Sequence, residues 1–292
     1  MRQIDRKTKV ILHCVAAAIA LALFLGLPYV LPPAGGAGNG NAPFQIHVID
    51  VGQGDAMLLM SEDATALIDT GTNASEGVLR AYLDSCGVES IDYLVISHPH
   101  EDHMGGADMV LREYDVKTLV LSDHAPDADV GLAFTQAINQ SGARVLIPHN
   151  GERVTLGELT LTILVPPDGE GGEINEHSLV VHGAYGQISL LTTGDAERET
   201  EEWLLQSCEA ALLNVDLLKA GHHGSDTSTG ASFLAALTPD YVAISCGRGN
   251  SYNHPVQSVL DAIAAAGAQA CRTDLDGTLV FASDGERLWR VR

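Results

Sequence analysis

Basic residues are scarce in this sequence. Lys and Arg total 16 against 38 Asp and Glu, and the formal net charge of the 292 residues is −22. Four of the basic residues, Arg2, Arg6, Lys7 and Lys9, lie in the first nine positions beside one acid, Asp5. Those nine residues carry +3, so the rest of the chain carries −25. A body of that sign repels phosphate backbones at long range, and a nucleic-acid function would need local basic or metal charge. An acid-rich, soluble surface is the simpler interpretation of the charge.

The sequence also lacks any Cys-x-x-Cys pair among its five cysteines. This absence argues against a zinc site built from cysteine. Cys246 and Cys271 lie near the ends of two expected strands and could pair outside the cytoplasm. Buried free thiols are the favoured interpretation, because a domain of this size needs no disulfide.

A 22-residue apolar stretch follows the basic start, at 10–31, with only His13 and Cys14 as weakly polar members. About 20 apolar residues span a bilayer as a helix. Basic residues on the N-terminal side keep that end in the cytoplasm and send the rest outward. The stretch exceeds the ~7–15-residue core of a signal peptide, although small residues at 34–38 leave cleavage open. Residues 1–31 are therefore interpreted as a basic flank and membrane anchor, with a removed signal and a buried core helix as alternatives.

Residues 32–43 are rich in Gly, Pro, Asn and Ala and are expected to form a flexible linker. No repeat of fixed period occurs, and a hydrophobic content of 46% is typical of a globular domain. The pattern predicts strands at 44–50, 56–60, 64–69, 91–96, 117–121, 143–147, 158–165, 177–183, 187–193, 214–219, 240–245, 269–273 and 277–282. It predicts helices at 75–85, 105–114, 130–141, 196–207, 229–237 and 255–266. Runs of strands with helices between them favour one α/β domain, 44–292, with two sheets packed face to face and helices outside.

The densest group of metal-binding side chains follows a buried strand at 91–96. His98, His100, Asp102 and His103 lie within six residues, and Gly105-Gly106 then opens a helix. Imidazole and carboxylate are ligands that zinc, manganese and iron accept. A single His is usually structural, but three His and an Asp at this spacing indicate a metal site.

This His98-x-His100-x-Asp102-His103 run matches the HxHxDH signature of the metallo-β-lactamase superfamily. The resemblance implies a four-layer αββα sandwich in which the first two His bind one metal and the Asp and third His bind the second. Three further segments resemble family landmarks in the same order. They are 67–71, whose Asp69 would support the metal loop; 190–195, ending in a metal-bridging Asp195; and 217–225, supplying the last His ligand.

A closer resemblance is to the extracytoplasmic hydrolase domain of ComEC-type competence proteins. It rests on the segments 50–55, 222–225, 250–255 and 272–277, so the landmarks run from about residue 46 to 281. Those relatives commonly lack a His at the positions of His100 and His177, whereas this chain has both. No multi-helix membrane channel precedes the domain, so DNA transport is not carried over.

The resemblance implies two divalent ions, Zn²⁺ or Mn²⁺, with a bridging water. His98, His100 and His177 would hold one ion, Asp102, His103 and His222 the other, and Asp195 would bridge them. Each assignment has a plainer alternative: His177 could cap a strand, and Asp195 could cap a helix. His223 is expected to face the substrate, with the reverse assignment of the two neighbouring His left open. The other His residues, at 13, 47, 124, 149 and 182, are interpreted as structural.

Three further residues are candidates for contacts near the substrate. His254 is either a substrate contact or a surface turn, and Asp55 lies in a Gly-flanked turn and could be either structural or functional. Ser225 could hold a phosphate oxygen. The expected catalytic residues are Asp102, His223 and His254, and the two histidines are expected to donate protons.

Together these features predict a hydrolase whose metal-bridging hydroxide forms because two ions lower the pKa of water from ~15.7 towards ~7. The expected substrate is a phosphodiester, single-stranded DNA or a nucleotide outside the membrane. Alternatives are a cell-wall phosphodiester, a lactone or a β-lactam, since this fold alone does not decide the substrate. A metal-stabilised binding protein without catalysis is the alternative of another class. The membrane is the expected partner of the N-terminal segment, and no protein partner can be deduced.

Overall fold

The computed structural model describes residues 42–62, 64–124, 128–167 and 173–292, which belong to one compact unit, Ala37–Arg292. Its first sheet has the order β15-β14-β1-β2-β3-β4-β5-β6, and its second has the order β13-β12-β11-β10-β9-β8-β7. The strands of the first sheet are β1 (Phe44–Val48), β2 (Met57–Ser61), β3 (Ala64–Ile68), β4 (Ser90–Ile96), β5 (Asp115–Leu121), β6 (Arg144–Leu146), β14 (Leu279–Ser283) and β15 (Leu288–Arg290). Those of the second are β7 (Glu152–Leu156), β8 (Leu159–Leu164), β9 (Val180–Tyr185), β10 (Ile188–Thr192), β11 (Leu217–Lys219), β12 (Tyr241–Ile244) and β13 (Gln269–Arg272).

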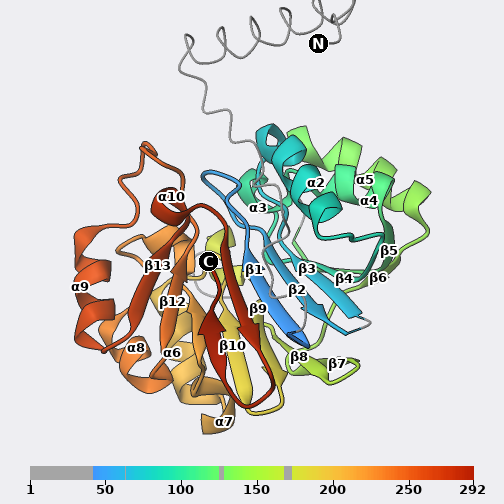
Figure 1. The fold of residues 1–292 in the computed structure, drawn as a ribbon. Helices are drawn as coiled ribbons and strands as arrows, with labels where there is room; N and C mark the ends of the chain where they lie inside the picture. The colour runs from blue at the N-terminus through green and yellow to red at the C-terminus, as the bar shows by residue number, and fades with distance from the viewer. Residues whose placement is uncertain (1–41, 63, 125–127, 168–172) are drawn as a thin grey trace, which may run out of the picture. The chain divides into compact units, whose positions relative to one another are not determined.

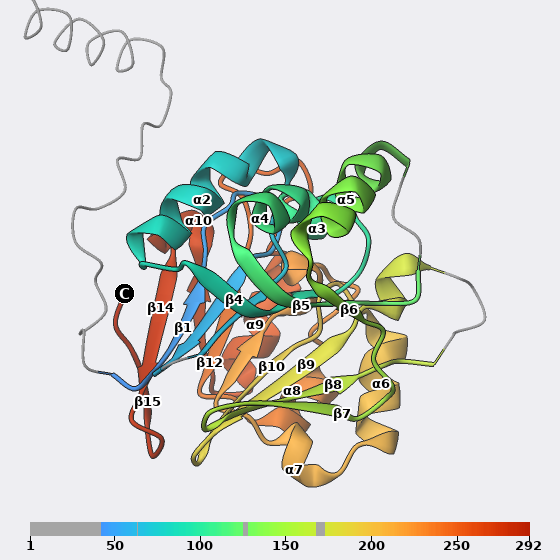
Figure 2. The same ribbon diagram turned by 90° about the vertical axis from the view of Figure 1, so that its right-hand side faces the viewer.

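The two sheets face one another across an apolar core that includes Phe44, Leu161, Leu190 and Phe281. The outer face of the first sheet packs under α2 (Glu76–Ser85), α4 (Ala107–Glu113) and α5 (Ala128–Ser141) (Figure 2). The outer face of the second packs under α6 (Arg198–Ser207), α8 (Ala231–Leu237) and α9 (Gln257–Ala265) (Figure 1). Because each sheet buries both faces, its central strands are almost continuously apolar. The expected αββα sandwich is confirmed.

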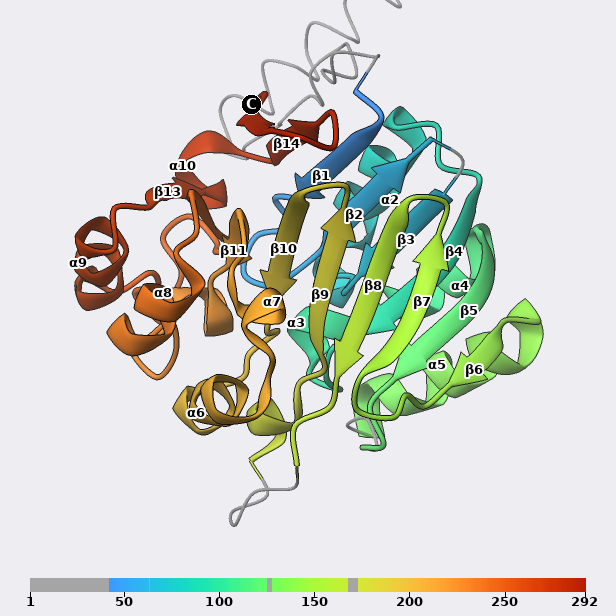
Figure 3. The same ribbon diagram turned by 90° about the horizontal axis from the view of Figure 1, so that it is seen from below.

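Every expected strand and long helix is present, with shifted ends. The two additional strands are β7 and β15, and the short helices α7 (Ala210–Leu213) and α10 (Thr273–Asp276) were also not expected. β7 forms an antiparallel hairpin with β8 and is the edge strand of the second sheet, with β8 between it and β9 (Figure 3). Its five residues alternate exposed and buried, a pattern too short to separate from loop by sequence. His177 was expected to open a strand, but it ends the 3₁₀ turn η2 (Ile174–His177), and β9 begins three residues later.

Two further expectations concern cysteines and the membrane. Cys86, Cys208, Cys246 and Cys271 are free thiols, so the disulfide alternative is not what the structure contains. Among the residues that the structure describes, no helix combines the length and apolar character that crossing a bilayer requires. The expected anchor at 10–31 lies outside those residues.

The parallel strand pairs decide where the functional side chains meet. β3 pairs in parallel with β4, and β10 pairs in parallel with β11, whose neighbour β12 is also parallel. The carboxyl ends of parallel strands lie at one edge of their sheet. Asp69, the run from Ser97, Asp195 and the 222–223 doublet all follow such ends directly, and the sandwich brings the edges of both sheets together.

Candidate metal centre

Four side chains from three segments converge at this edge: Asp102, His103, Asp195 and His223. Asp102 and His103 lie on α3 (Glu101–Met104), the short helix that begins after β4. The Nε2 atom of His223 lies 3.2 Å from Asp102 Oδ2 and 3.4 Å from Asp195 Oδ2. The Nε2 atom of His103 lies 3.2 Å from Asp195 Oδ1. The four ligand-type atoms therefore surround one small volume.

These four residues fit a divalent metal ion. His103 Nε2 and Asp195 Oδ1 are fully buried, yet neither makes a hydrogen bond of good geometry. Burial by itself would raise the pKa of Asp195, but His223 and His103 hold that pKa well below its usual range. The pKa of Asp102 is lowered in the same way by His223 and His103 against the effect of burial. Two ionised carboxylates and two imidazoles form a donor set that suits zinc, manganese or iron.

His98 and His100 form a second pair of imidazoles beside this group. His98 Nε2 lies 3.0 Å from His100 Nδ1, and the His98 ring lies 4.2 Å from the His103 ring between centroids. The ring of His177 stacks on that of His124 at 4.2 Å. In the part of the chain that the structure describes, His98, His100 and His177 do not form a converging set like the first four. The expected role of His177 as a ligand stays a prediction.

The backbone nevertheless holds His177 near the site. Its neighbour Ser178 accepts a hydrogen bond from the Asp195 backbone N–H at 3.2 Å. Leu179 donates its N–H to the Ser97 carbonyl at 2.8 Å. The η2 turn is therefore bound directly to the loops that carry His98 and Asp195.

Asp69 lies behind the site and contacts His103 and Ser97. Its Oδ2 atom lies 2.8 Å from His103 Nδ1 and accepts the Ser97 hydroxyl at 2.8 Å, while Oδ1 accepts the Ser97 N–H at 2.7 Å. A carboxylate on the far ring nitrogen orients an imidazole toward its metal and selects its tautomer. Asp69 therefore positions His103 and the start of the histidine run together.

The two histidines of the doublet have different surroundings. His223 is buried against Asp102 and Asp195, whereas the nearest approach of His222 to Asp195 is 3.8 Å, from Nε2 to Oδ2. His222 Nδ1 lies 3.2 Å from Glu197 Oε1 and 3.1 Å from Thr227 Oγ1, and its side chain is 25% exposed. The preference for His222 as the ligand and His223 toward the substrate is therefore the reverse of what this geometry favours. Both residues have positive φ, 46° and 55°, and sequence alone does not show which ring such a turn directs inward.

Other expected contacts are also placed. The ring of His254 lies 5.8 Å from the His222 ring, so His254 borders the site through His222. The Ser225 hydroxyl oxygen accepts hydrogen bonds from Thr227 N–H and Oγ1, and its expected contact with a phosphate oxygen stays a prediction. The alternative of Asp195 as a helix cap is not borne out, because α6 begins at Arg198 with Glu197 in the N-cap position.

Lys219 and Asp55 form a buried ion pair next to the site. Asp55 was an open candidate, whereas Lys219 was missed. A signal for Lys219 existed in the sequence: it ends the apolar run Leu217-Leu218, and a charged group in a buried strand requires a partner of opposite charge.

Glu201 supports the histidine doublet from α6 and was also missed. Its carboxylate accepts the backbone N–H groups of Thr229 and Gly230. Thr229 Oγ1 in turn accepts the N–H of Gly221, the residue that precedes the doublet. Burial raises the pKa of the Glu201 carboxyl from 4.5 to about 7, despite those two hydrogen bonds.

Glu201 gives a prediction about stability and pH. A carboxyl whose pKa is raised in the folded state stabilises the fold below its unfolded pKa, and that contribution is lost as pH rises through the folded pKa. Relative to the non-titrating Glu201→Gln variant, the wild type should lose about 3 kcal/mol of unfolding free energy between pH 4.5 and 7. Urea denaturation of both proteins across this range measures the difference. A constant difference would contradict the raised pKa.

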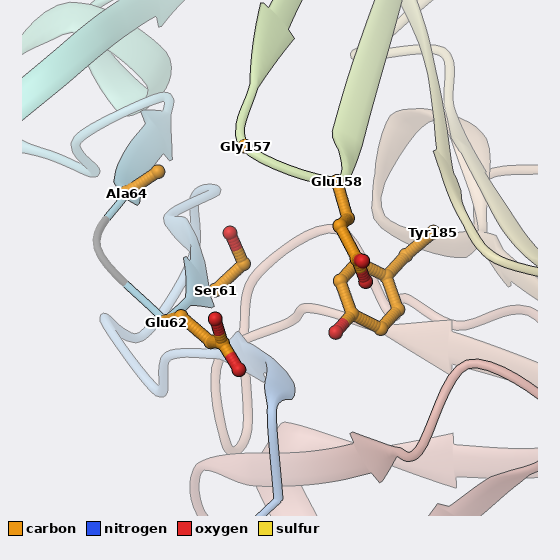
Figure 4. A pocket seen from close by; sticks show the side chains of 6 residues that line it. All are labelled: Ser61, Glu62, Ala64, Gly157, Glu158 and Tyr185. Atoms are coloured by element: carbon orange, nitrogen blue, oxygen red, sulfur yellow. The ribbon is translucent and has the colours of Figure 1, made fainter.

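One cavity lies away from this edge. It is lined by Ser61, Glu62, Ala64, Gly157, Glu158 and Tyr185. Figure 4 shows Ser61 and Glu62 on one side of it and Glu158 and Tyr185 on the other. These residues lie at or near the ends of β2, β8 and β9 that point away from Asp55 and Asp195. The cavity is therefore separate from the candidate metal centre.

Comparison with known proteins agrees with this site. The sequence pattern of the Metallo-beta-lactamase superfamily matches residues 49–248, which include all four converging residues. The chain belongs to the metallo-β-lactamase superfamily, which supports a metal-dependent hydrolase in general. It is 31% identical to ComE operon protein 3 of Bacillus subtilis (strain 168), over 81% of this chain and 33% of that protein. It is 33% identical to competence protein ComA of Neisseria gonorrhoeae, over 81% of this chain and 32% of that protein.

The chain spans about a third of the length of these curated relatives. Among solved structures, the fold resembles the metallo-beta-lactamase fold protein YhfI from Bacillus subtilis, with a TM-score of 0.54 and 17% identity over 85% of this chain and 99% of that one. It also resembles Igni18, a metallo hydrolase from Ignicoccus hospitalis, with a TM-score of 0.53 and 16% identity over 82% of this chain and 99% of that one. These two likenesses support the fold alone.

Proposed function

We propose that this protein is a metal-dependent phosphodiesterase that cleaves single-stranded DNA or nucleotides on the outer side of the membrane, anchored through residues 10–31. The observation that carries the proposal is the convergence of Asp102, His103, Asp195 and His223 at the edge of the sandwich. Zn²⁺ or Mn²⁺ is the proposed ion, because the donors are two carboxylates and two imidazoles.

In this proposal one ion would be held by Asp102, His103 and His223. The other would be held by His98, His100 and His177, and Asp195 would contribute to both. Two such ions, when bound, supply Lewis acidity and a water acidic enough to lose its proton near neutral pH. His223 takes the ligand role first expected of His222. Asp69 fixes the orientation of His103, and the Asp102 carboxylate stays ionised against burial because His223 and His103 lie beside it.

His222 and His254 are the proposed proton donors on the substrate side. His222 reaches solvent, and Glu197 lies 3.2 Å from its Nδ1 atom and orients its ring. Its Nε2 atom lies 3.8 Å from Asp195 Oδ2. At this position it could donate a proton to the leaving oxygen of a substrate bound beside Asp195. A positioned imidazole that donates a proton to the leaving group contributes typically about 10²–10⁴-fold in rate.

The choice of a phosphodiester is supported by one relative that is named a competence protein. It is also supported by a further relative, 31% identical, that is named recombination protein 2 of Haemophilus influenzae. The acidic chain counts against tight binding of a long polymer, since few cations are available to neutralise phosphates. A short single-stranded segment or a nucleotide fits both observations better than duplex DNA.

The experiment is hydrolysis of bis-p-nitrophenyl phosphate and of labelled single-stranded DNA by the full chain in detergent. The protein is stripped of metal and then given Zn²⁺ or Mn²⁺. Metal-dependent cleavage of both substrates supports the proposal. Cleavage of the small diester alone favours a small-molecule or cell-wall phosphodiester. Inactivity on both contradicts the proposal and favours a lactone, a β-lactam or a binding role.

Tyr252 gives a prediction about substrate recognition. It is 64% exposed, and its ring stacks on His254, which contacts His222, so a row of three rings leads from the surface to Asp195. Asn250 Oδ1 accepts the N–H groups of Tyr252 and His254 and holds this loop in place. A base stacked on an exposed aromatic ring contributes about 1–3 kcal/mol, so Tyr252→Ala should raise KM for a short oligodeoxynucleotide about 5- to 150-fold.

The matched control for Tyr252→Ala removes the stacking base from the DNA and leaves the protein unchanged. Steady-state kinetics are measured on oligonucleotides that each lack one base. At one position, loss of the base should raise KM for the wild type but not for the variant. Equal sensitivity of both enzymes at every position would refute a stacking role.

A further inference from the structure

Lys219 is a charged residue in an apolar environment. It ends β11, its neighbours Leu217 and Leu218 are fully buried, and it is itself only 1% exposed. Its ammonium group forms an ion pair with Asp55 Oδ2. A buried ammonium without a partner is strongly unfavourable, so Asp55 is required by Lys219 and the converse also holds.

Asp55 also reaches the two imidazoles of the converging group from behind. Its Oδ1 atom lies 3.2 Å from His223 Nδ1, and its Oδ2 atom lies 3.9 Å from His103 Nδ1. The Asp55 backbone is held in place, because its N–H donates to the Asp102 carbonyl at 3.0 Å and its carbonyl accepts the Gly71 N–H at 2.7 Å. The ion pair therefore contacts the rings on the side away from the four converging atoms.

We propose that Lys219 and Asp55 act as a positioning pair that holds the His223 ring with Nδ1 toward Asp55 and Nε2 toward Asp102 and Asp195. This inference rests on the proposed ligand role of His223. A carboxylate or carbonyl on the far nitrogen of a metal-binding His fixes both ring orientation and tautomer. For His223, Nδ1 forms a hydrogen bond with the Ser245 carbonyl at 3.1 Å, and the Asp55 carboxylate lies 3.2 Å from the same nitrogen.

The backbone of His223 does little to fix the orientation of its ring, so the ring depends on contacts with other residues. Its φ of 55° lies in the left-handed region that non-glycine residues rarely adopt, within a four-residue 3₁₀ turn. Lys219 keeps Asp55 in place beside another carboxylate, since Asp69 also lies nearby. The cavity that Lys219, Asp55 and Asp69 line has a volume of about 10 Å³, roughly the space of one water, so the ammonium has little room to move elsewhere.

The alternative is that the pair only neutralises buried charge, and three variants separate the two roles. Lys219→Met leaves Asp55 without its partner, Asp55→Asn leaves Lys219 without its partner, and the double variant removes both charges at similar volume. Lys117→Met is the control, because Lys117 forms an exposed ion pair with Asp115. The readouts on the full chain are the melting temperature without metal, the Zn²⁺ dissociation constant by chelator competition, and the ¹⁵N chemical shifts of the His223 ring.

A positioning role predicts that Lys219→Met and the double variant each weaken Zn²⁺ binding about 10- to 100-fold, even where the double variant melts like the wild type. The ring shifts should show that His223 no longer holds a single tautomer. A double variant with wild-type melting, wild-type Zn²⁺ affinity and unchanged His223 shifts would overturn the proposal. If the wild type binds neither Zn²⁺ nor Mn²⁺, the proposed function fails. The ring shifts of the metal-free variants then decide the positioning role: altered shifts support it and unchanged shifts refute it.

Discussion

Replacing Asp195 with Asn is expected to lower turnover of a phosphodiester by at least ~10³-fold and to weaken metal retention. Asp195 is the residue whose two oxygens approach both histidines of the group, His103 at 3.2 Å and His223 at 3.4 Å. The Asn side chain has the same shape as Asp but carries no negative charge. One of its two oxygens is replaced by an NH₂ group, which does not coordinate a metal ion. Steady-state kinetics and the metal content after dialysis measure both effects.

The matched control is Asp216→Asn, the same substitution at the other end of the strand pair β10 and β11. Asp216 accepts the Ser189 N–H at 2.7 Å, and it lies at the start of β11, away from the site. It should retain its metal and most of its activity. If Asp195→Asn behaved like this control, Asp195 could not be the residue between the two ions.

Gly54→Ala is expected to destabilise the fold strongly although it adds a single methyl group. The φ of Gly54 is +145°, and a Cβ there would lie 2.5 Å from the Asp102 backbone carbonyl oxygen. The backbone conformation alone costs about 1–3 kcal/mol for a residue with a side chain. The clash is with backbone, so relief requires movement of Asp55 or Asp102. The sum should exceed about 3 kcal/mol and lower the melting temperature by about 6–12 °C.

Gly52→Ala is the control for that change, because Gly52 lies in the same loop with a φ of +79° and its Cβ would meet nothing within 4 Å. It should show the cost of the backbone conformation without the clash, about 1 kcal/mol. Calorimetry on both variants, with Zn²⁺ affinity measured alongside, separates the two contributions. Equal melting temperatures for the two variants would contradict the predicted clash, because they would mean that the backbone at Gly54 and Asp102 moves apart at little cost in free energy.

The sequence predicted the sandwich because both of its signals are local. Apolar runs with strand spacing mark β4, β10 and β14, and the longer amphipathic segments mark α2 and α9. The run from His98 to His103 likewise predicts a metal site from six contiguous residues. β7 and the 3₁₀ turn at His177 were missed because short segments carry too little periodicity to be distinguished from loops.

The roles of paired or neighbouring groups depended on tertiary contacts. His222 and His223 are adjacent, and only the turn that they form directs one ring to Asp102 and Asp195 and the other to Glu197. Ser225 forms hydrogen bonds with Thr227 in its own loop, and Thr227 in turn contacts His222. Asp55 and Lys219 are 164 positions apart, so nothing local in the sequence connects them.

The sequence by itself therefore determined the fold class, the family and the residue types at the site, because periodicity and motif spacing are properties of contiguous chain. Which imidazole faces the carboxylates, and which buried charges stand behind them, was decided only in the folded protein. Those features depend on loops from β1, β4, β10 and β11 that meet only when the two sheets pack together.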